Sequence, residues 1–316
     1  MKDLIPEAEI TAALAETITP YLNGRRTVLT VTSADGTALY TLYYRADTPR
    51  GTLVITHGFG EHADKYCEFI YYCLLEGLSV LIYDQRGHGR STRKAPLGVI
   101  HVDRFTDYLN DFDAVYAAYE KDLARPLYLF GHSMGGAIAT LILEKYPARF
   151  KSAVLSAPML DLTYKRKDRL MAVLAATAAC LFTNRKKPIP VRKKEESGTP
   201  FERSNYRSPA RFAATRALIE QNPLFSGGTP SRAWALAALG VRKQIFKKGA
   251  PEQVEAPILL LTAEKENRVS NEAHALFAAR APRVTHLHLA DTRHEILFAE
   301  DEKAFPVLEK IHEFLR

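Results

Sequence analysis

Cysteine is scarce in this chain: its 316 residues include three, Cys67, Cys73 and Cys180. Three unevenly spaced thiols cannot form the disulfide framework on which many small secreted proteins depend. A secretory signal is also lacking, because no apolar run follows Lys2 near the amino terminus. We therefore expect a reducing compartment and a cytoplasmic location for the protein.

Long apolar runs are lacking as well. The longest is Leu170–Phe182, which has 13 residues, whereas a helix that crosses a bilayer needs about 20. The sequence therefore predicts no transmembrane span. A run of this length can still lie in a membrane interface.

Metal-binding and nucleotide-binding signatures are also absent from the sequence. The ten histidines show neither H-E-x-x-H nor another ligand spacing, so we expect no metal. The loop Arg86–Arg90 is superficially like a phosphate loop but lacks the Lys-Ser/Thr ending of that motif. We predict no cofactor. We also predict no nucleic-acid partner, because the basic stretches lack interleaved aromatic residues.

Negative charge is depleted in one part of the chain. Residues 160–250 contain 19 lysines and arginines but 6 aspartates and glutamates, a net charge of +13, while the remainder carries −6 of the total of +7. Such asymmetry favours an anionic partner or surface for this segment. The alternative is a basic face that is simply solvated.

What the sequence does contain is a regular alternation of short apolar runs and amphipathic stretches. A hairpin signal comes first, with β-rich runs at Thr27–Ser33 and Leu39–Tyr44. The alternation that follows predicts an α/β fold, a parallel sheet buried on both faces by helices. Its predicted strands are Leu53–Thr56, Val80–Tyr83, Leu127–Phe130 and Ala153–Ser156, and its predicted helices are Lys65–Glu76, Phe105–Tyr119 and Ser133–Tyr146.

The alternation stops after Met159 and resumes at a predicted strand, Pro257–Leu261. Alanine-rich helical pieces and no comparable strand lie between them. We interpret residues 160–250 as a helical basic lid inserted between two parts of the α/β core, residues 1–159 and 251–316. The predicted lid helices are Leu170–Phe182, Pro209–Glu220 and Arg232–Leu239, and the core then continues with helix Glu272–Ala279, strand Thr285–Leu289 and helix Glu302–Leu315.

The segment Gly131–Gly136 matches the G-x-S-x-G motif, with Ser133 at its centre. It follows a predicted buried strand and opens a predicted helix, which is the context that the motif requires. Glycines allow a sharp, strained turn that holds the serine away from the strand and helix. Ser133 is therefore our candidate nucleophile.

A serine nucleophile needs an oxyanion hole, and a glycine-rich turn supplies one candidate. Thr56–Gly60 follows the strand that should lie beside the nucleophile strand. The backbone N–H groups of Phe59 and Met134 can then converge on one point, as a tetrahedral intermediate requires. We expect the side chain of His57 to be structural, because its position demands only backbone geometry.

The general base and its acid partner should come later in the chain. In α/β folds that carry the G-x-S-x-G turn, the three catalytic residues occur along the chain in the order serine, acid, histidine. His294 lies in the loop between the last predicted strand and the last helix, which makes it the candidate base. The acid should follow the strand Pro257–Leu261, where no aspartate is present. Glu266 and Glu264 are the candidates there, with Asp161 as an outside alternative. We favour Glu266.

These motifs and their flanking residues resemble the bacterial lysophospholipase and monoacylglycerol lipase group of α/β-hydrolases. The resemblance implies an α/β-hydrolase fold, with Glu266 at a position where most relatives have aspartate. It also implies that Phe59 and Met134 are the oxyanion donors. The resembling segments, which lie in both parts of the core, are His57–His62 with Tyr66, Tyr83–Ser91, Gly131–Gly136, Ser156–Met159, and His294–Leu297 with Glu300.

The predicted activity is that of a serine hydrolase that cleaves one fatty-acyl ester, from a lysophospholipid or a monoacylglycerol, through an acyl-enzyme. A general carboxylesterase or prolyl-type peptidase on the same fold is an alternative, as is an inactive binding protein. The run Leu170–Phe182 is flanked by Lys165–Lys167 and Arg185–Lys187. This pattern favours peripheral contact with an anionic membrane surface.

Overall fold

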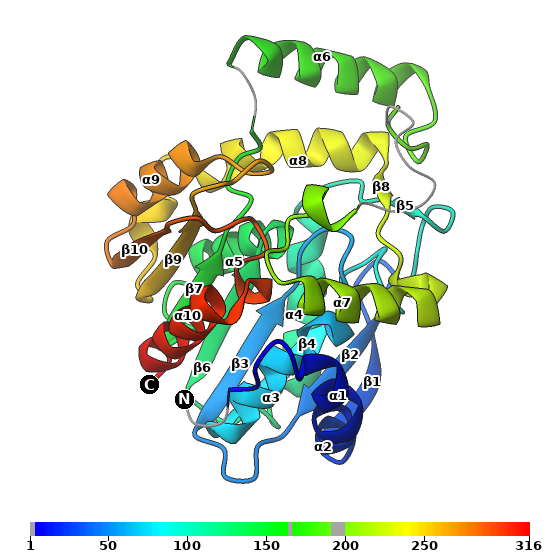
Figure 1. The fold of residues 1–316 in the computed structure, drawn as a ribbon. Coiled ribbons are helices and arrows are strands. Elements are labelled where there is room, and N and C mark those ends of the chain that lie inside the picture. The colour runs from blue at the N-terminus through cyan, green and yellow to red at the C-terminus, as the bar shows by residue number, and fades with distance from the viewer. Residues whose placement is uncertain (1–3, 164–165, 191–199) are drawn as a thin grey trace.

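The computed structural model describes residues 4–163, 166–190 and 200–316. Its centre is an eight-stranded sheet with the strand order β1-β2-β4-β3-β6-β7-β9-β10 (Figure 1). The pairs β1–β2 and β2–β4 are antiparallel and the other pairs are parallel. The strands are β1 (Arg26–Thr32), β2 (Ala38–Tyr44), β3 (Gly51–Thr56), β4 (Leu78–Tyr83), β6 (Leu127–His132), β7 (Ser152–Ser156), β9 (Ile258–Ala263) and β10 (Val284–Leu289).

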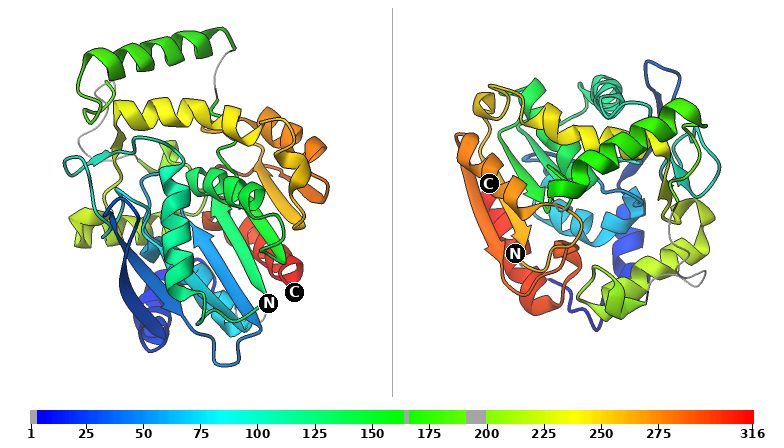
Figure 2. Two further views of the ribbon diagram at one scale, coloured as in Figure 1. Left: turned by 180° about the vertical axis from the view of Figure 1, so that it is seen from behind. Right: turned by 90° about the horizontal axis from the view of Figure 1, so that it is seen from above.

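Helices cover both faces of the sheet, as the views from opposite sides show (Figures 1 and 2). One buried apolar cluster joins the sheet to α4, α5, α8 and α9, and a second joins it to α1, α2, α3 and α10. The central strands are buried along their whole length because both faces are covered. This architecture confirms the predicted α/β fold. The helices of the core are α3 (Cys67–Leu75), α4 (Asp107–Tyr119), α5 (Met134–Lys145), α9 (Asn271–Arg280) and α10 (Asp301–Phe314).

Several elements were not predicted. A short helical region precedes β1, and a two-residue strand, β8 (Thr229–Pro230), pairs with β5 (Val99–Ile100). The unpredicted helical region packs beside α3 and buries Ile10, Ile18 and Leu22 in the second apolar cluster. It consists of α1 (Ile10–Ala13), a π-helical turn (Leu14–Ile18) and α2 (Thr19–Asn23).

The predicted lid segment contains α6 (Arg166–Phe182), α7 (Pro209–Gln221) and α8 (Arg232–Ile245). Helix α8 is longer than predicted, and Trp234 and Val241 pack into the same apolar cluster as α5. Helix α6 lies over α8, on the side away from the sheet (Figures 1 and 2).

One part of the predicted membrane-contact pattern cannot be placed, because Lys165 lies outside the described residues. In the described ranges, no helix combines the length and the hydropathy that a membrane crossing requires.

Candidate active site

Ser133 occupies the turn between strand β6 and helix α5. Its backbone has φ 53° and ψ −120°, a strained conformation for a residue with a Cβ atom. Hydrogen bonds from neighbouring segments hold this turn. The Ser133 amide donates to the Ser156 carbonyl at 3.0 Å, and the Ser133 carbonyl accepts from the Met159 amide at 2.8 Å. The surrounding structure thus fixes the serine at the carboxyl end of β6.

The glycines around Ser133 are required by close packing. A Cβ atom on Gly135 would lie 1.9 Å from the Thr56 carbonyl oxygen, and one on Gly136 would lie 2.6 Å from the Pro158 side chain. Neither distance is compatible with a side chain. The first turn of α5 therefore packs directly against the end of β3, which brings the serine beside the turn Thr56–Gly60.

The three residues predicted as the triad lie in one hydrogen-bonded line. His294 Nε2 is 2.9 Å from Ser133 Oγ, and His294 Nδ1 is 2.6 Å from Glu266 Oε2. These residues come from loops that follow β6, β9 and β10, whose carboxyl ends meet at one edge of the sheet. The arrangement is that of a nucleophile, a base and a group that orients the base.

Glu266 is held in an ionised form suited to that third position. Burial alone would raise the pKa of its carboxyl, but hydrogen bonds from His294 and from backbone amides lower the pKa below its ordinary value. Its Oε1 accepts from the amides of Asn267, Arg268 and Val269 at 2.8, 2.7 and 3.3 Å. An ionised Glu266 favours the tautomer of His294 with the proton on Nδ1, so that Nε2 can accept from the serine hydroxyl.

The alternative acids have other partners. Glu264 Oε2 accepts from the Asp291 amide at 2.7 Å. Asp161 Oδ2 lies 3.3 Å from an Arg242 guanidinium nitrogen. The structure therefore brings Glu266, and neither of the other two, into hydrogen-bond contact with His294.

The turn after β3 carries Phe59, whose backbone amide is one of the two predicted oxyanion donors. His57 anchors it, since its Nε2 accepts from the Gln85 amide at 2.9 Å and its other ring nitrogen lies 2.8 Å from the Gly58 carbonyl. Met134 is the first residue of α5, so its amide has no intrahelical partner. The ring of Phe59 packs on Trp234 with centroids 4.2 Å apart, which fixes the turn from the α8 side.

Sequence reasoning missed a buried ionic cluster beside the triad. The Lys65 ammonium contacts Glu61 Oε1 at 2.5 Å and Glu295 Oε2 at 2.7 Å, and His132 Nε2 lies 3.7 and 3.6 Å from the same oxygens. Glu61, His132 and Glu295 have the donor types of a metal site, but Lys65 already supplies a cation between the two carboxylates. Lys65 and Glu295 are 230 residues apart, so no local pattern could have paired them.

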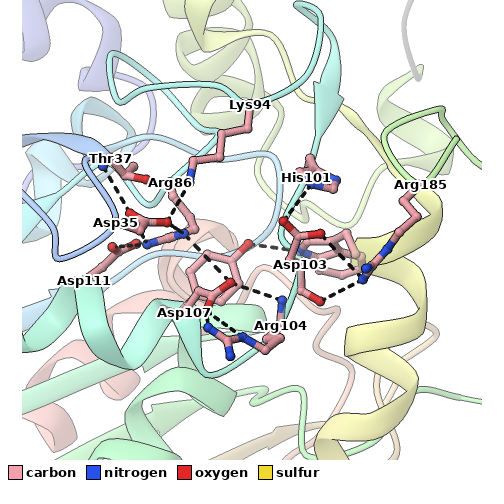
Figure 3. Close-up of polar contacts among 12 residues, drawn as sticks. Asp35, Thr37, Arg86, Lys94, His101, Asp103, Arg104, Asp107, Asp111 and Arg185 are labelled. Atoms are coloured by element: carbon pink, nitrogen blue, oxygen red, sulfur yellow. Dashed lines mark hydrogen bonds and ion pairs between the residues drawn. The ribbon is translucent and has the colours of Figure 1, made fainter. Parts of the chain in front are cut away.

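A surface pocket of about 370 Å³ lies apart from these residues. Figure 3 shows that its carboxylates face basic side chains: Asp35 pairs with Arg86 and Lys94, and Asp107 pairs with Arg104. Such pairing leaves little uncompensated charge for chemistry. The hydrogen-bonded line through Ser133 identifies the candidate site better than pocket size does. The pocket is lined by Ser33, Ala34, Asp35, Asp103, Arg104, Asp107 and Asn110.

Comparison with known proteins agrees with this geometry. A model of the family described as serine aminopeptidase, S33, matches residues 47–302. Lysophospholipase L2 of Escherichia coli strain K12 is 30% identical over 301 residues, which cover 90% of this chain and 85% of that protein. Monoacylglycerol lipase of Mycolicibacterium smegmatis is 26% identical and covers 84% of this chain and 88% of its own length.

Among solved structures, a thermostable carboxyl esterase from Bacillus coagulans in complex with glycerol superposes with a TM-score of 0.73 at 18% identity. The superposition covers 92% of this chain and 98% of the esterase. The predicted resemblance and the α/β-hydrolase fold are both confirmed by these similarities.

Proposed function

The chain belongs to the serine aminopeptidase S33 family of α/β-hydrolases, and on that premise we propose that it hydrolyses the single fatty-acyl ester of a lysophospholipid or monoacylglycerol. The observation that carries the proposal is the line from Ser133 through His294 to Glu266. The lipid ester as substrate is supported by relatives named lysophospholipase L2 and monoacylglycerol lipase, which match most of the chain. No cofactor enters the proposed reaction.

Acylation begins when Ser133 Oγ attacks the ester carbonyl carbon and its proton passes to His294 Nε2. A bond forms between Oγ and carbon, and the carbonyl oxygen becomes an oxyanion. We assign the amides of Phe59 and Met134 to stabilise that charge, a contribution typically worth about 3–4 kcal/mol for each donor. The ester C–O bond then breaks, His294 returns the proton to the leaving alkoxide, and the alcohol departs.

Deacylation repeats these steps with water as the nucleophile. His294 takes a proton from water as the oxygen attacks the acyl carbon, and it gives the proton back to Ser133 Oγ when the fatty acid leaves. Glu266 stays ionised through both halves of the reaction. We assign Glu266 to orient the imidazole of His294 and to stabilise the imidazolium.

Our proposal for residues 160–250 is a lid whose helix α6 docks on anionic lipid surfaces. The exposed face of α6 is apolar: Met171, Leu174, Leu181 and Phe182 are 65, 54, 73 and 83% exposed. Their spacing places them along one side of the helix. The exposed basic segment Arg185–Lys187 begins three residues after the end of α6, so apolar side chains can enter the acyl boundary while cations meet phosphates.

A substrate panel tests the proposed activity. The purified chain should release fatty acid from lysophospholipids or monoacylglycerols with kcat/KM at least tenfold above that for short p-nitrophenyl esters and prolyl peptides. A fluorophosphonate probe should label Ser133. Preference for a prolyl peptide or a short ester would overturn the lipid assignment, and absence of labelling in the folded protein would overturn the enzyme assignment.

Vesicle co-sedimentation tests the docking of α6. Binding to vesicles that contain anionic phospholipid should fall sharply as ionic strength rises, because salt screens the attraction of the cations. Equal binding to neutral and anionic vesicles would contradict the electrostatic part of the proposal. No binding to either would leave the segment as a cover of the substrate pocket.

A further inference from the structure

The buried ionic cluster lies between the two loops on which the proposed reaction depends. Glu61 is in the turn that carries Phe59, and Glu295 directly follows His294. Lys65 contacts both carboxylates, and its side chain is 3% exposed, against 9% for Glu61 and 11% for Glu295. The ammonium group therefore forms one direct link between the oxyanion turn and the base loop.

On the oxyanion side, Glu61 fixes the backbone next to the proposed donor. Its Oε2 accepts from the Gly58 amide at 2.7 Å and from the Tyr66 hydroxyl at 2.7 Å. Lys65 holds the other carboxylate oxygen. Because Gly58 directly precedes Phe59, a shift of the Glu61 carboxylate would move the peptide that carries the Phe59 amide.

The base side has the same anchor. Glu295 Oε2 accepts from Lys65 at 2.7 Å. His132, the residue before the nucleophile, completes the cluster: its ring lies 4.9 Å from that of His294, and its Nδ1 is 3.1 Å from the Ser156 carbonyl. The cluster thus contacts the loops after β3, β6 and β10 at once.

Buried ion pairs are a poor source of net stability, because desolvation offsets much of the attraction between the charges. Burial alone would raise the pKa of the Glu61 carboxyl, but the Lys65 ammonium offsets this and holds the pKa below its ordinary value. The neighbouring carboxylates likewise hold the pKa of the Lys65 ammonium above its ordinary value, so Glu61 and Lys65 are both charged at neutral pH. Their arrangement is better explained by geometry, since a misplacement of about 1 Å can reduce turnover on the order of 100-fold.

We propose that Lys65 is a positioning residue that, through Glu61 and Glu295, sets the Phe59 amide relative to His294. The inference rests on the proposed serine-hydrolase function. Lys65 touches no reacting atom. Its effect is on the chemical step, so it should change kcat much more than KM.

Lys65→Met is the main test, with kcat and KM measured on a soluble p-nitrophenyl ester. We expect kcat to fall about 10- to 100-fold while KM changes less than about threefold, and the rate of fluorophosphonate labelling should fall in parallel. Glu295→Gln removes one ion pair but keeps the contact between Glu61 and Gly58. Glu295→Gln should reduce kcat about three- to tenfold. If Lys65→Met does not fold, this variant tests the positioning role instead.

Arg86→Met is the matched control. The Arg86 side chain makes a buried ion pair with Asp111 at 2.5 Å, with side chains 6 and 0% exposed. Its other ion pairs among the described residues are with Asp35 and Asp107 rather than with Glu61 or Glu295 (Figure 3). This variant should lose thermal stability much as Lys65→Met does but keep its kcat within about twofold of the original.

Two results would overturn the positioning assignment. One is a folded Lys65→Met or Glu295→Gln variant with unchanged kcat. The other is an equal fall in kcat for Arg86→Met at the same loss of melting temperature, which would mark a general effect of destabilisation. Failure of the proposed function looks different, because the unmodified protein itself would then neither turn over esters nor react with the probe.

Discussion

The side chains of the proposed triad and those of helix α6 differ in whether they find partners within the chain. In the proposed triad the polar atoms are partly buried and paired: Ser133 Oγ contacts His294, His294 contacts Glu266, and Glu266 also accepts from backbone amides. In α6 the large side chains most exposed to solvent are apolar, with Phe182 83% exposed. One region completes its own contacts, while the other leaves apolar surface without cover from the described chain.

This difference matches the two tasks that the proposed lipid-ester hydrolase must perform. Chemistry needs fixed distances, which buried hydrogen bonds and tight packing supply. Access to an insoluble substrate needs a surface whose partner lies outside the protein, and an exposed apolar face of this kind marks such a contact. Substitutions in the triad should therefore change turnover, and substitutions on α6 should change where turnover occurs.

The largest expected effect is loss of the nucleophile or the base. Ser133→Ala and His294→Ala should each reduce kcat by on the order of 10⁴-fold or more, because triad members act as a unit. Circular dichroism and melting temperature should show that both variants stay folded. Retention of more than about a tenth of the activity would contradict the assignment, since that loss corresponds to only ~1.4 kcal/mol.

Glu266→Gln should have the next largest effect, a fall in kcat of about 10³- to 10⁴-fold. The amide cannot stabilise the imidazolium, and it favours the wrong tautomer of His294. Glu264→Gln and Asp161→Asn are matched controls, because each changes a carboxylate that makes no hydrogen bond to His294 in the structure. Steady-state kinetics on one ester compares all three, and an equal loss in either control would refute the choice of Glu266.

On α6 the expected effect is on membrane binding. Leu181→Ser combined with Phe182→Ser should lower the fraction bound to anionic vesicles at least tenfold, because burial of each side chain contributes about 1.5–3 kcal/mol. Turnover of a soluble ester should stay within about twofold. Leu75→Ser is the control, since Leu75 is 42% exposed but lies on α3. Undiminished vesicle binding by the double variant would exclude this face as the contact.

The residues that could be predicted from the sequence are those whose position depends on local pattern. Ser133 and Glu266 could be placed because each follows a strand of strong apolar character, β6 or β9, and His294 because it lies between the last strand and the last helix. Parallel strands bring their carboxyl ends to one edge. The glycines of the motif indicate close packing, and the structure shows it at Gly135, which lies against the Thr56 carbonyl. The main strands were predicted for the same reason, as continuous buried runs.

Features that depend on distant partners could not be predicted. The pairing of Lys65 with Glu295 arises only when the chain folds, and α6 gives no local sign of which face α8 will cover. The amino-terminal helical region was missed because it has few buried apolar residues, among them Ile10 and Ile18. Its helical form therefore depends on packing against α3 and α7 rather than on its own pattern.

One buried carboxyl group of the core lacks the pairing seen among Ser133, His294 and Glu266. Glu144 lies on α5 and is 7% exposed, and its Oε1 has no hydrogen-bond partner among the described residues. Burial raises the pKa of this carboxyl to about 9. The folded protein therefore holds a proton there that the unfolded chain, with a pKa of about 4.3, has already released.

The difference in proton binding between the folded and unfolded states sets the direction in which stability changes with pH. Between these two pKa values the folded state binds more protons than the unfolded state, so stability is highest below the unfolded pKa and declines as pH rises toward the folded one. Glu144→Gln copies the protonated form and removes the decline. At pH 8 it should raise the melting temperature by roughly 2–4 °C for each kcal/mol gained, with little change at pH 5 and none in kcat. Glu220→Gln is the control, because its side chain is 71% exposed. Equal shifts of the two variants at pH 5 and pH 8 would show that Glu144 is ionised in the folded protein.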